Sequence, residues 1–288
     1  MKHRMRPEWL RTKLPAGKNY NEIKSILRQQ RLFTVCEEAL CPNIGECFEA
    51  RTATFLILGD TCTRQCGFCA VKKGSPPEVN KEEPFRVATA VKEMRLQYAV
   101  ITSVTRDDLS DNGATAYAQT IRCIREGIKT CKVEVLIPDF GGSFELLQVV
   151  LNAVPDVLNH NMETVPRLYS QVRSMSDYHV SLEVLRHTLK YMPGVTTKSG
   201  IMLGLGEKWD EVISVMRDIR DTGCDILTIG QYLKPGKNAL PIQRYYTPEE
   251  FCLLKWEGKR MGFKHVESGP LVRSSYHAKM QSGTVLTC

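Results

Sequence analysis

The 288-residue sequence predicts an α/β fold in which six strand–helix units form most of a parallel barrel. Short apolar runs rich in β-branched residues recur after residue 50, and segments with helical periodicity separate them. The runs are apolar throughout, as expected of strands that are buried on both faces. A regular alternation of strands and helices is typical of a parallel sheet with crossover helices.

The predicted elements follow one another at even spacing. The strands are residues 54–58, 98–103, 132–137, 157–161, 200–205 and 225–232. The helices between and after them are residues 86–96, 114–129, 143–153, 182–191, 209–221 and 248–261. Polar residues follow each strand, and in a parallel barrel the loops after the strands form one face that carries the active site. We therefore expect these polar residues to converge: Cys62, residues 105–108, Asp139, Asn161, Glu163, Gly206, Glu207, Gln231 and Tyr232.

Composition indicates a globular protein, because hydrophobic and charged fractions of 42% and 25% are ordinary for that class. No apolar run is long enough to span a bilayer, and the N-terminus lacks the apolar core of a signal peptide. We therefore expect a cytoplasmic protein whose partners include neither a membrane nor a nucleic acid.

The chain divides into three predicted parts: residues 1–50, a barrel over residues 51–262, and a C-terminal segment over residues 263–288. Residues 1–31 hold nine basic and two acidic residues, so this arm accounts for the whole formal charge of +7. It is either a solvated, partly disordered arm or one that meets an acidic partner. Glu8 and the short distance to folded-looking sequence argue against a mitochondrial transit peptide.

The eleven cysteines are unevenly placed, with six of them between positions 36 and 69. In a cytoplasmic chain we expect reduced thiols or metal ligands rather than disulfides. Scattered single cysteines usually pack as small hydrophobic residues, so we assign no role to the other five. These are Cys123, Cys131, Cys224, Cys252 and Cys288.

Three cysteines form a C-x3-C-x2-C pattern at Cys62, Cys66 and Cys69. Three thiolates on a short loop can hold three corners of a cubane iron–sulfur cluster and leave one iron open to a substrate. A zinc site is the alternative, but it requires a fourth ligand, and residues up to Asn80 offer none. Buried, inert thiols are a further alternative.

An earlier group, Cys36-x4-Cys41-x5-Cys47, is spaced too loosely for a standard zinc knuckle. Three more cysteines upstream of the first pattern predict a second, auxiliary cluster. Its fourth ligand must come from elsewhere in the chain or be absent.

The C-x3-C-x2-C pattern, with the aromatic Phe68 before its third cysteine, resembles the radical S-adenosylmethionine (SAM) superfamily. The resemblance implies a partial (β/α)6 barrel of the TIM type whose open iron binds SAM. It also implies reductive cleavage of SAM to a 5′-deoxyadenosyl radical that abstracts hydrogen from an unactivated carbon. The superfamily's glycine motif has a match in Gly200, Met202, Gly204 and Glu207. Glycines more often serve close backbone packing, so this match gains its weight from lying at a strand end.

The two cysteine patterns together resemble the lipoyl synthase family over nearly the whole chain. Further matching segments are residues 6–11, 53–60, 101–108 (ITSVTRDD), 159–163 (NHNME), 198–207 (KSGIMLGLGE), 230–233 (GQYL) and 273–276 (RSSY). In the family the RSSY serine ligates the auxiliary cluster, which implies Ser275 here, with Ser274 as the alternative. Taken alone, Ser275 would be an ordinary loop serine. Thr105 departs from the family, which more often has an acidic residue there, and this weakens any SAM contact at that position.

The resemblance implies insertion of two sulfur atoms, at C6 and C8, into an octanoyl chain on a carrier lysine. Implied cofactors are two [4Fe–4S] clusters and SAM, with the auxiliary cluster as the sulfur source. Implied partners are octanoylated carriers (the glycine-cleavage H protein and E2 lipoyl domains), an electron donor such as flavodoxin or ferredoxin, and an iron–sulfur repair carrier. N- and C-terminal extensions would then carry the auxiliary cluster beside the barrel. The basic arm would meet the acidic carrier.

Several further residues are candidates for contact with SAM or substrate, although each could be a satisfied structural group instead. They are Phe68, Asn161, Glu163, Lys198, Gly204 and Glu207. Arg273 either supports the serine ligand or pairs with a carboxylate.

Two other functions compete with this interpretation. One is a different radical SAM sulfur-inserting enzyme that resembles biotin synthase, against which the Cys36, Cys41 and Cys47 set argues. The other is an electron-transfer or redox-sensing iron–sulfur protein. A ferredoxin-like carrier does not need a barrel of roughly two hundred residues, and its clusters usually have four cysteines each.

Overall fold

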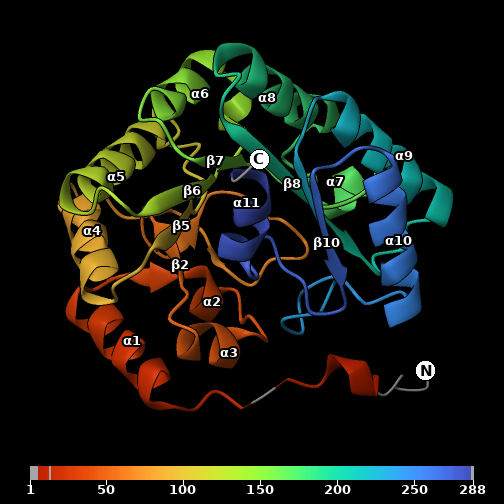
Figure 1. The fold of residues 1–288 in the computed structure, drawn as a ribbon, viewed down its shortest axis with the longest axis horizontal. Helices are drawn as coiled ribbons and strands as arrows, with labels where there is room; N and C mark the ends of the chain where they lie inside the picture. The colour runs from red at the N-terminus through yellow and green to blue at the C-terminus, as the bar shows by residue number, and fades with distance from the viewer. Residues whose placement is uncertain (1–5, 13, 287–288) are drawn as a thin grey trace.

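The computed structural model describes residues 6–12 and 14–286, in which eight strands form one curved sheet and β3 and β4 form a separate small one (Figure 1). Neighbouring strands of the large sheet follow the order of the chain, β1-β2-β5-β6-β7-β8-β9-β10, and every pair from β2 onward is parallel. The six predicted strands are all present: β2 (Thr54–Ile57), β5 (Tyr98–Ser103), β6 (Lys132–Leu136), β7 (Val157–Asn159), β8 (Thr196–Leu203) and β9 (Ile226–Gln231). The predicted partial barrel is confirmed.

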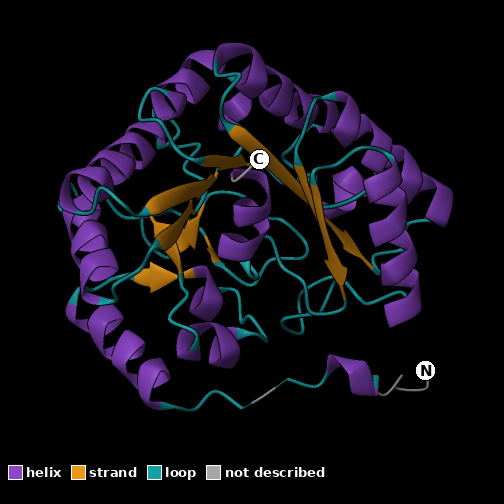
Figure 2. Cartoon of the chain, in the orientation of Figure 1, coloured by secondary structure: helices purple, strands orange, loops and turns teal. Residues whose placement is uncertain are grey.

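The six predicted helices form the outer ring around this sheet (Figure 2). They are α4 (Glu83–Glu93), α5 (Ala114–Gly127), α6 (Phe144–Leu151), α8 (Tyr178–Tyr191), α9 (Trp209–Asp221) and α10 (Pro248–Arg260). Side chains that accept hydrogen bonds from free backbone N–H groups fix several of the helix starts. Ser143 and Asp177 cap α6 and α8 in this way, and Thr247 forms a capping box with Glu250 at α10.

Two strands of the large sheet lie outside the six-strand prediction. The short β1 (Phe33–Thr34) pairs antiparallel with β2, and β10 (His265–Gly269) pairs parallel with β9. The sheet therefore continues past residue 262, where the sequence analysis placed the end of the barrel. The sequence of β10 gives no apolar run, because all of its residues except Val266 are only half-buried.

The N-terminal arm is more ordered than the solvated arm considered from its charge. A short 3-10 turn, η1 (Glu8–Leu10), precedes α1 (Lys18–Gln29), whose buried face consists of Ile23, Ile26 and Leu27. This amphipathic face packs the helix beside α3 and α4. Two short helices, α2 (Val35–Glu38) and α3 (Ile44–Glu49), then carry the first cysteine group.

The C-terminal helix α11 (Ala278–Leu286) lies within the ring of strands in Figure 1. Its Ala278 packs against Tyr98 and Val100 at the start of β5, so the chain returns to the barrel interior after the RSSY motif. The smaller elements are β3 (Thr61–Cys62), β4 (Lys72–Lys73), η2 (Phe140–Gly142), η3 (Pro166–Leu168) and α7 (Tyr169–Val172). Within the described residues, the helices are too short or too polar to cross a bilayer.

Candidate active site

The loop that carries Cys62, Cys66 and Cys69 follows β2 and is fastened to its neighbours through its backbone. The Thr63 N–H donates to the Thr105 carbonyl at 3.1 Å, and the Gly67 N–H donates to the Val172 carbonyl at 3.0 Å. The Thr105 N–H in turn donates to the Cys62 sulfur at 3.3 Å. Position 105 therefore acts here through its backbone, which tolerates threonine in place of an acidic residue.

Arg64, between the first two cysteines of this loop, anchors it to two other strand ends. Its guanidinium forms paired hydrogen bonds of 2.7–3.3 Å with the carboxylates of Asp107 and Asp139, which follow β5 and β6. The Arg64 side chain is only 7% exposed. Burial alone would raise the pKa of Asp139, but Arg64 outweighs it and lowers that pKa to about 2. A bidentate, buried pair of this kind fixes the orientation of the loop as well as its position.

A cavity of about 380 Å³ lies at the carboxyl ends of the strands, and cysteines from both groups are among the residues that line it. Cys69 lies in one wall, and Cys36, Cys41 and Cys47 lie in another. The structure thus brings together the two patterns that the sequence separates. Phe68 also lines the cavity and packs against the apolar core of the C-terminal half.

The N-terminal cysteines are close enough to influence one another. Burial raises the pKa of the Cys36 thiol to about 12, and Cys41 adds to this effect. Burial also raises the pKa values of Cys41 and Cys47, and neighbouring thiols raise the latter further. Three enclosed thiols resist ionisation until a positively charged group replaces their protons, as an iron–sulfur cluster would. In the described part of the chain, no three Cys, His, Asp or Glu side chains are grouped tightly enough for a single metal ion.

Residues 271–277, here called the C-terminal turn, return to this N-terminal group. The Asn43 amide donates to the Leu271 carbonyl at 2.6 Å, and the Tyr276 hydroxyl donates to Glu46 at 3.0 Å. Ser275 accepts a hydrogen bond of 2.8 Å from the Thr54 hydroxyl at the start of β2. Thr54 also contacts the Cys36 sulfur and lowers its pKa against the larger effect of burial. The structure therefore places Ser275 beside the N-terminal cysteines, where the sequence analysis expected it.

Asn161 and Glu163 lie after β7 on another wall of the same cavity. Desolvation raises the pKa of the Glu163 carboxyl, although Arg173 opposes this shift. The Asn161 amide nitrogen donates to Glu163 at 2.9 Å and to Ser274 at 2.7 Å, while its Oδ1 is buried without a partner. A buried acceptor without a partner, beside a carboxylate, fits a ligand that brings hydrogen-bond donors or a positive charge.

Gly200 creates the space for the Asn161 side chain. A Cβ at this position would stand 2.5 Å from the Thr228 hydroxyl and 2.9 Å from Asn161 Oδ1, both closer than van der Waals contact allows. Gly200 also lines the cavity. It is therefore a member of the KSGIMLGLGE segment that shapes the site directly.

Gly204 and Glu207, from the same segment, shape the end of β8 instead. Gly204 has φ +104°, a conformation that favours glycine, and its N–H donates to Glu207 at 2.6 Å. The other oxygen of Glu207 accepts from the Leu205 N–H at 2.9 Å. Neither residue is among those that line the cavity, so a direct SAM contact by either stays a prediction without structural support.

Lys198 lies deeper in the barrel. It is fully buried, and its ammonium group pairs with Glu134 of β6 at 3.0 Å. The same carboxylate accepts hydrogen bonds from Tyr98 and Asn159. This network satisfies Lys198 away from the cavity lining, so a SAM contact by Lys198 stays a prediction without structural support.

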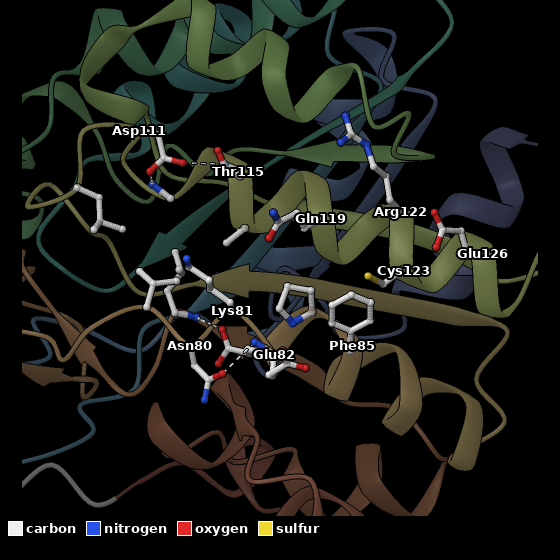
Figure 3. Close-up of a pocket in the computed structure, with 17 residues that line it drawn as sticks. Asn80, Lys81, Glu82, Phe85, Asp111, Thr115, Gln119, Arg122, Cys123 and Glu126 are labelled. Carbon is white, nitrogen blue, oxygen red and sulfur yellow. Dashed lines mark hydrogen bonds between the residues drawn. The ribbon is translucent and has the colours of Figure 1, made fainter.

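A larger cavity of about 730 Å³ lies on the outside of the barrel between α4 and α5 (Figure 3). Phe85 and Cys123 face it, and Asp111 caps α5 at its edge through the Thr115 N–H. Both cysteine groups lie elsewhere, so its size does not make it the active site.

Sequence reasoning missed the roles of Arg64, Thr54 and Arg173. In the sequence, Arg64 between two loop cysteines is typical of a solvated charge. The only sign of its partners was the position of Asp107 and Asp139 after two predicted strands. Arg173 is buried and donates to the Asn161 carbonyl at 2.8 Å, but it follows a turn with no distinctive pattern.

Comparisons with known proteins agree with this geometry. The family model described as the radical SAM superfamily matches residues 56–219, and the model described as the N-terminal domain of lipoyl synthase matches residues 1–41. A lipoyl synthase of Rubrobacter xylanophilus is 59% identical over 96% of this chain and 86% of its own length. One of Koribacter versatilis is 55% identical over 97% and 92%.

The chain belongs to the lipoyl synthase family. It is accordingly a radical SAM sulfurtransferase that uses two [4Fe–4S] clusters and SAM to insert sulfur at C6 and C8 of an octanoyl-lysine on a lipoyl-domain protein. Membership in this family sets aside the biotin synthase-like and electron-transfer alternatives.

Solved structures share only the fold. A maturase of the [FeFe]-hydrogenase, HydG, aligns with a TM-score of 0.56 and 14% identity over 84% of this chain and 62% of its own. Methylornithine synthase aligns with a TM-score of 0.53 and 13% identity over 74% and 69%.

Proposed function

We propose that Cys62, Cys66 and Cys69 hold the SAM-binding cluster and that Cys36, Cys41, Cys47 and Ser275 hold the auxiliary cluster. The observation that carries this proposal is one cavity that Cys69 lines together with Cys36, Cys41, Cys47 and Ser275. When bound, the first cluster supplies the electron that cleaves SAM, and the second supplies the sulfur. Because both clusters would lie at the same cavity, a single bound octanoyl chain could reach each of them.

The cavity wall between the two groups suits SAM on one side and an alkyl chain on the other. Glu163 offers a carboxylate and Asn161 a buried acceptor without a partner, which together complement the cationic amino group of SAM. Apolar side chains fill much of the remaining lining, and they would bury the octanoyl chain away from water: Leu136, Ile201, Met202, Tyr232 and Val272.

The rim of the cavity suits the entry of a lysine tether. Leu40 is 63% exposed although it lines the cavity, and Lys234 and Pro235 lie at the same opening. An exposed apolar residue at a cavity mouth is a candidate contact for a partner protein. We infer that the octanoylated lysine of the carrier enters here.

Replacing Ser275 tests the ligand assignment. Ser275→Cys should retain the auxiliary cluster, because thiolate is the better ligand for iron, but should lower lipoyl product by holding that iron more firmly. Ser275→Ala should give a labile cluster. The measurements are Mössbauer spectra and lipoyl product per chain. Wild-type spectra and yields in both variants would move the assignment to Ser274.

We also propose that the basic arm steers acidic carriers, including H protein and E2 lipoyl domains, to this opening. Arg6 lines the cavity, whereas Lys2, Arg4 and Lys13 lie outside the described residues. Reversing Lys2 and Arg4 to Glu should reduce activity on a whole carrier but not on an octanoyl-lysine peptide. Added salt should act in the same direction, because surface charges are screened over about 8 Å at physiological ionic strength. Equal salt sensitivity for both substrates would contradict steering.

If the auxiliary cluster supplies the sulfur, repeated turnover of the enzyme needs two further partner proteins. A one-electron donor such as flavodoxin or ferredoxin would reduce the SAM-binding cluster, and an iron–sulfur carrier would rebuild the auxiliary one. Both are tested by adding each purified protein to the reaction: the donor should replace dithionite, and the repair carrier should raise product above one lipoyl group per chain. If no donor replaced dithionite and no carrier raised the product above one lipoyl group per chain, the need for these two partners would be contradicted.

A further inference from the structure

The RSSY motif has two adjacent serines, and they face different parts of the protein. Ser275 accepts its hydrogen bond from Thr54, on the side of the N-terminal cysteines. Ser274 accepts its hydrogen bond from Asn161, 2.7 Å away at the end of β7. The two hydroxyl groups therefore connect one short turn to two different walls of the cavity.

Asn161 is shared between this turn and the proposed SAM contacts. Its amide nitrogen donates one hydrogen atom to Ser274 and the other to Glu163. An amide group has two N–H donors, so both are used and the orientation of the side chain is fixed. The Oδ1 atom of Asn161 therefore points toward the space that the missing side chain of Gly200 leaves free.

The rest of the C-terminal turn is held closely enough for this connection to matter. The Val272 carbonyl packs so near Gly230 of β9 that a Cβ there would stand 2.1 Å from it. Asn43 and Glu46 hold the turn from the N-terminal side. Because the backbone of the turn is held on both sides, we expect loss of the Ser274 hydroxyl to shift the adjacent Ser275 rather than more distant residues.

We propose that Ser274 is a positioning residue that links the two halves of the active site. Through Asn161 it sets the orientation of the SAM contacts, and through the backbone it sets the direction of Ser275 toward the N-terminal cysteines. This inference rests on the proposed function, because it takes Ser275 as the auxiliary-cluster ligand and Asn161 and Glu163 as SAM contacts.

The test uses the full-length enzyme, reconstituted anaerobically with ⁵⁷Fe in both clusters, in the variants Ser274→Ala and Ser274→Thr. Ser274→Ala should retain both clusters but raise the dissociation constant of SAM about two- to tenfold, the effect of one lost hydrogen bond. It should also change the Mössbauer signal of the auxiliary cluster. Ser274→Thr keeps the hydroxyl and should restore both properties.

Ser268→Ala is the matched control. Ser268 lies in the same C-terminal segment, and its hydroxyl donates to the Phe251 carbonyl at 2.8 Å, away from the cavity. This variant loses a comparable hydrogen bond, so it should lower the thermal midpoint similarly while leaving SAM binding and the Mössbauer signal unchanged.

The possible results separate this inference from the ligand assignment. Wild-type SAM affinity and spectra in Ser274→Ala would overturn the positioning role and leave Ser275 as the ligand. Loss of the auxiliary cluster in Ser274→Ala, with a normal cluster in Ser275→Ala, would overturn the ligand assignment itself. Changes in Ser274→Ala that Ser274→Thr reverses and Ser268→Ala lacks would support the inference.

Discussion

The cysteine loop at residues 62–69 and the cysteine segment at residues 36–47 face one cavity but are held by different parts of the chain. The loop is fixed by the barrel itself, through Arg64 and the strand ends that carry Asp107 and Asp139. The N-terminal segment lies on and between the short helices α2 and α3, and side-chain hydrogen bonds tie it to the C-terminal turn, more than 220 residues away in sequence. On the proposed assignment, the barrel would supply the site for SAM chemistry, whereas the two ends of the chain would assemble the auxiliary-cluster site.

The largest effect expected from this comparison is on iron content. Changing Cys62, Cys66 and Cys69 together to Ala should remove one of the two clusters and leave the other, and changing Cys36, Cys41 and Cys47 should do the reverse. Iron analysis with Mössbauer spectroscopy measures this. Eight irons per chain in either triple variant would contradict two separate sites.

Removing the arginine anchor should damage the barrel site selectively. Arg64→Gln leaves two carboxylates near one another without their cation, and breaking a buried pair in this way costs about 3–5 kcal/mol. We expect a lower unfolding midpoint and loss of the SAM-binding cluster, with the auxiliary cluster retained. The control is Arg167→Gln, which breaks a solvent-screened pair with Glu211 and should leave the unfolding midpoint nearly unchanged. Equal loss of both clusters in Arg64→Gln would argue against a local role.

Lowering the pH should reduce the stability of the folded protein through His160, which is buried in the barrel. Burial lowers the pKa of this imidazole to about 4, so it stays neutral in the folded protein while the unfolded chain binds a proton below about pH 6.5. The folded state should therefore lose up to about 3 kcal/mol as the pH falls from about 6.5 to about 4.

Thermal midpoints at pH 7.5 and 5.5 test this expectation. The decrease should be smaller in His160→Gln than in the wild type, and the exposed His179→Gln should behave as the wild type. An identical decrease in all three proteins would exclude His160 as the cause.

A smaller effect is expected where the two ends of the chain meet. Asn43→Ala removes the hydrogen bond to the partly buried Leu271 carbonyl, and losing one hydrogen bond of this kind costs about 0.5–1.5 kcal/mol. Iron should leave the auxiliary cluster faster under a chelator, while the SAM-binding cluster is unaffected. Asn152→Ala, on the outer surface at the end of α6, is the control and should change neither rate. Faster release from both clusters would mean that the termini support the whole barrel.

The same contrast explains what could be predicted from the sequence. Strand and helix periodicity located the barrel units, and both cysteine patterns were visible because their ligands are local in sequence. β10 was missed because its half-buried residues give no apolar run. Lys198 and Glu207 became candidate SAM contacts through the KSGIMLGLGE resemblance, but the direction of each side chain and the partners Glu134 and Leu205 depend on tertiary packing.

The role of Gly200 and the Thr54–Ser275 contact could not be predicted for a related reason. Gly200 matters because of the Asn161 side chain that fills the space above it, and Thr54 matters because a turn from the far end of the chain packs beside it. Such contacts join positions that no local pattern connects. The resemblance of the RSSY segment could suggest Ser275, but only the fold shows which surfaces the two serines face.

The most direct test of two cooperating sites uses a peptide carrying octanoyl-lysine deuterated at C6, incubated anaerobically with SAM and dithionite. With wild-type protein, mass spectrometry should show lipoyl product and deuterium in 5′-deoxyadenosine. The variant lacking Cys36, Cys41 and Cys47 should still transfer deuterium but form no carbon–sulfur bond, and the variant lacking Cys62, Cys66 and Cys69 should do neither. Sulfur insertion by the first variant would contradict the division between a barrel site for SAM and a terminal site for sulfur.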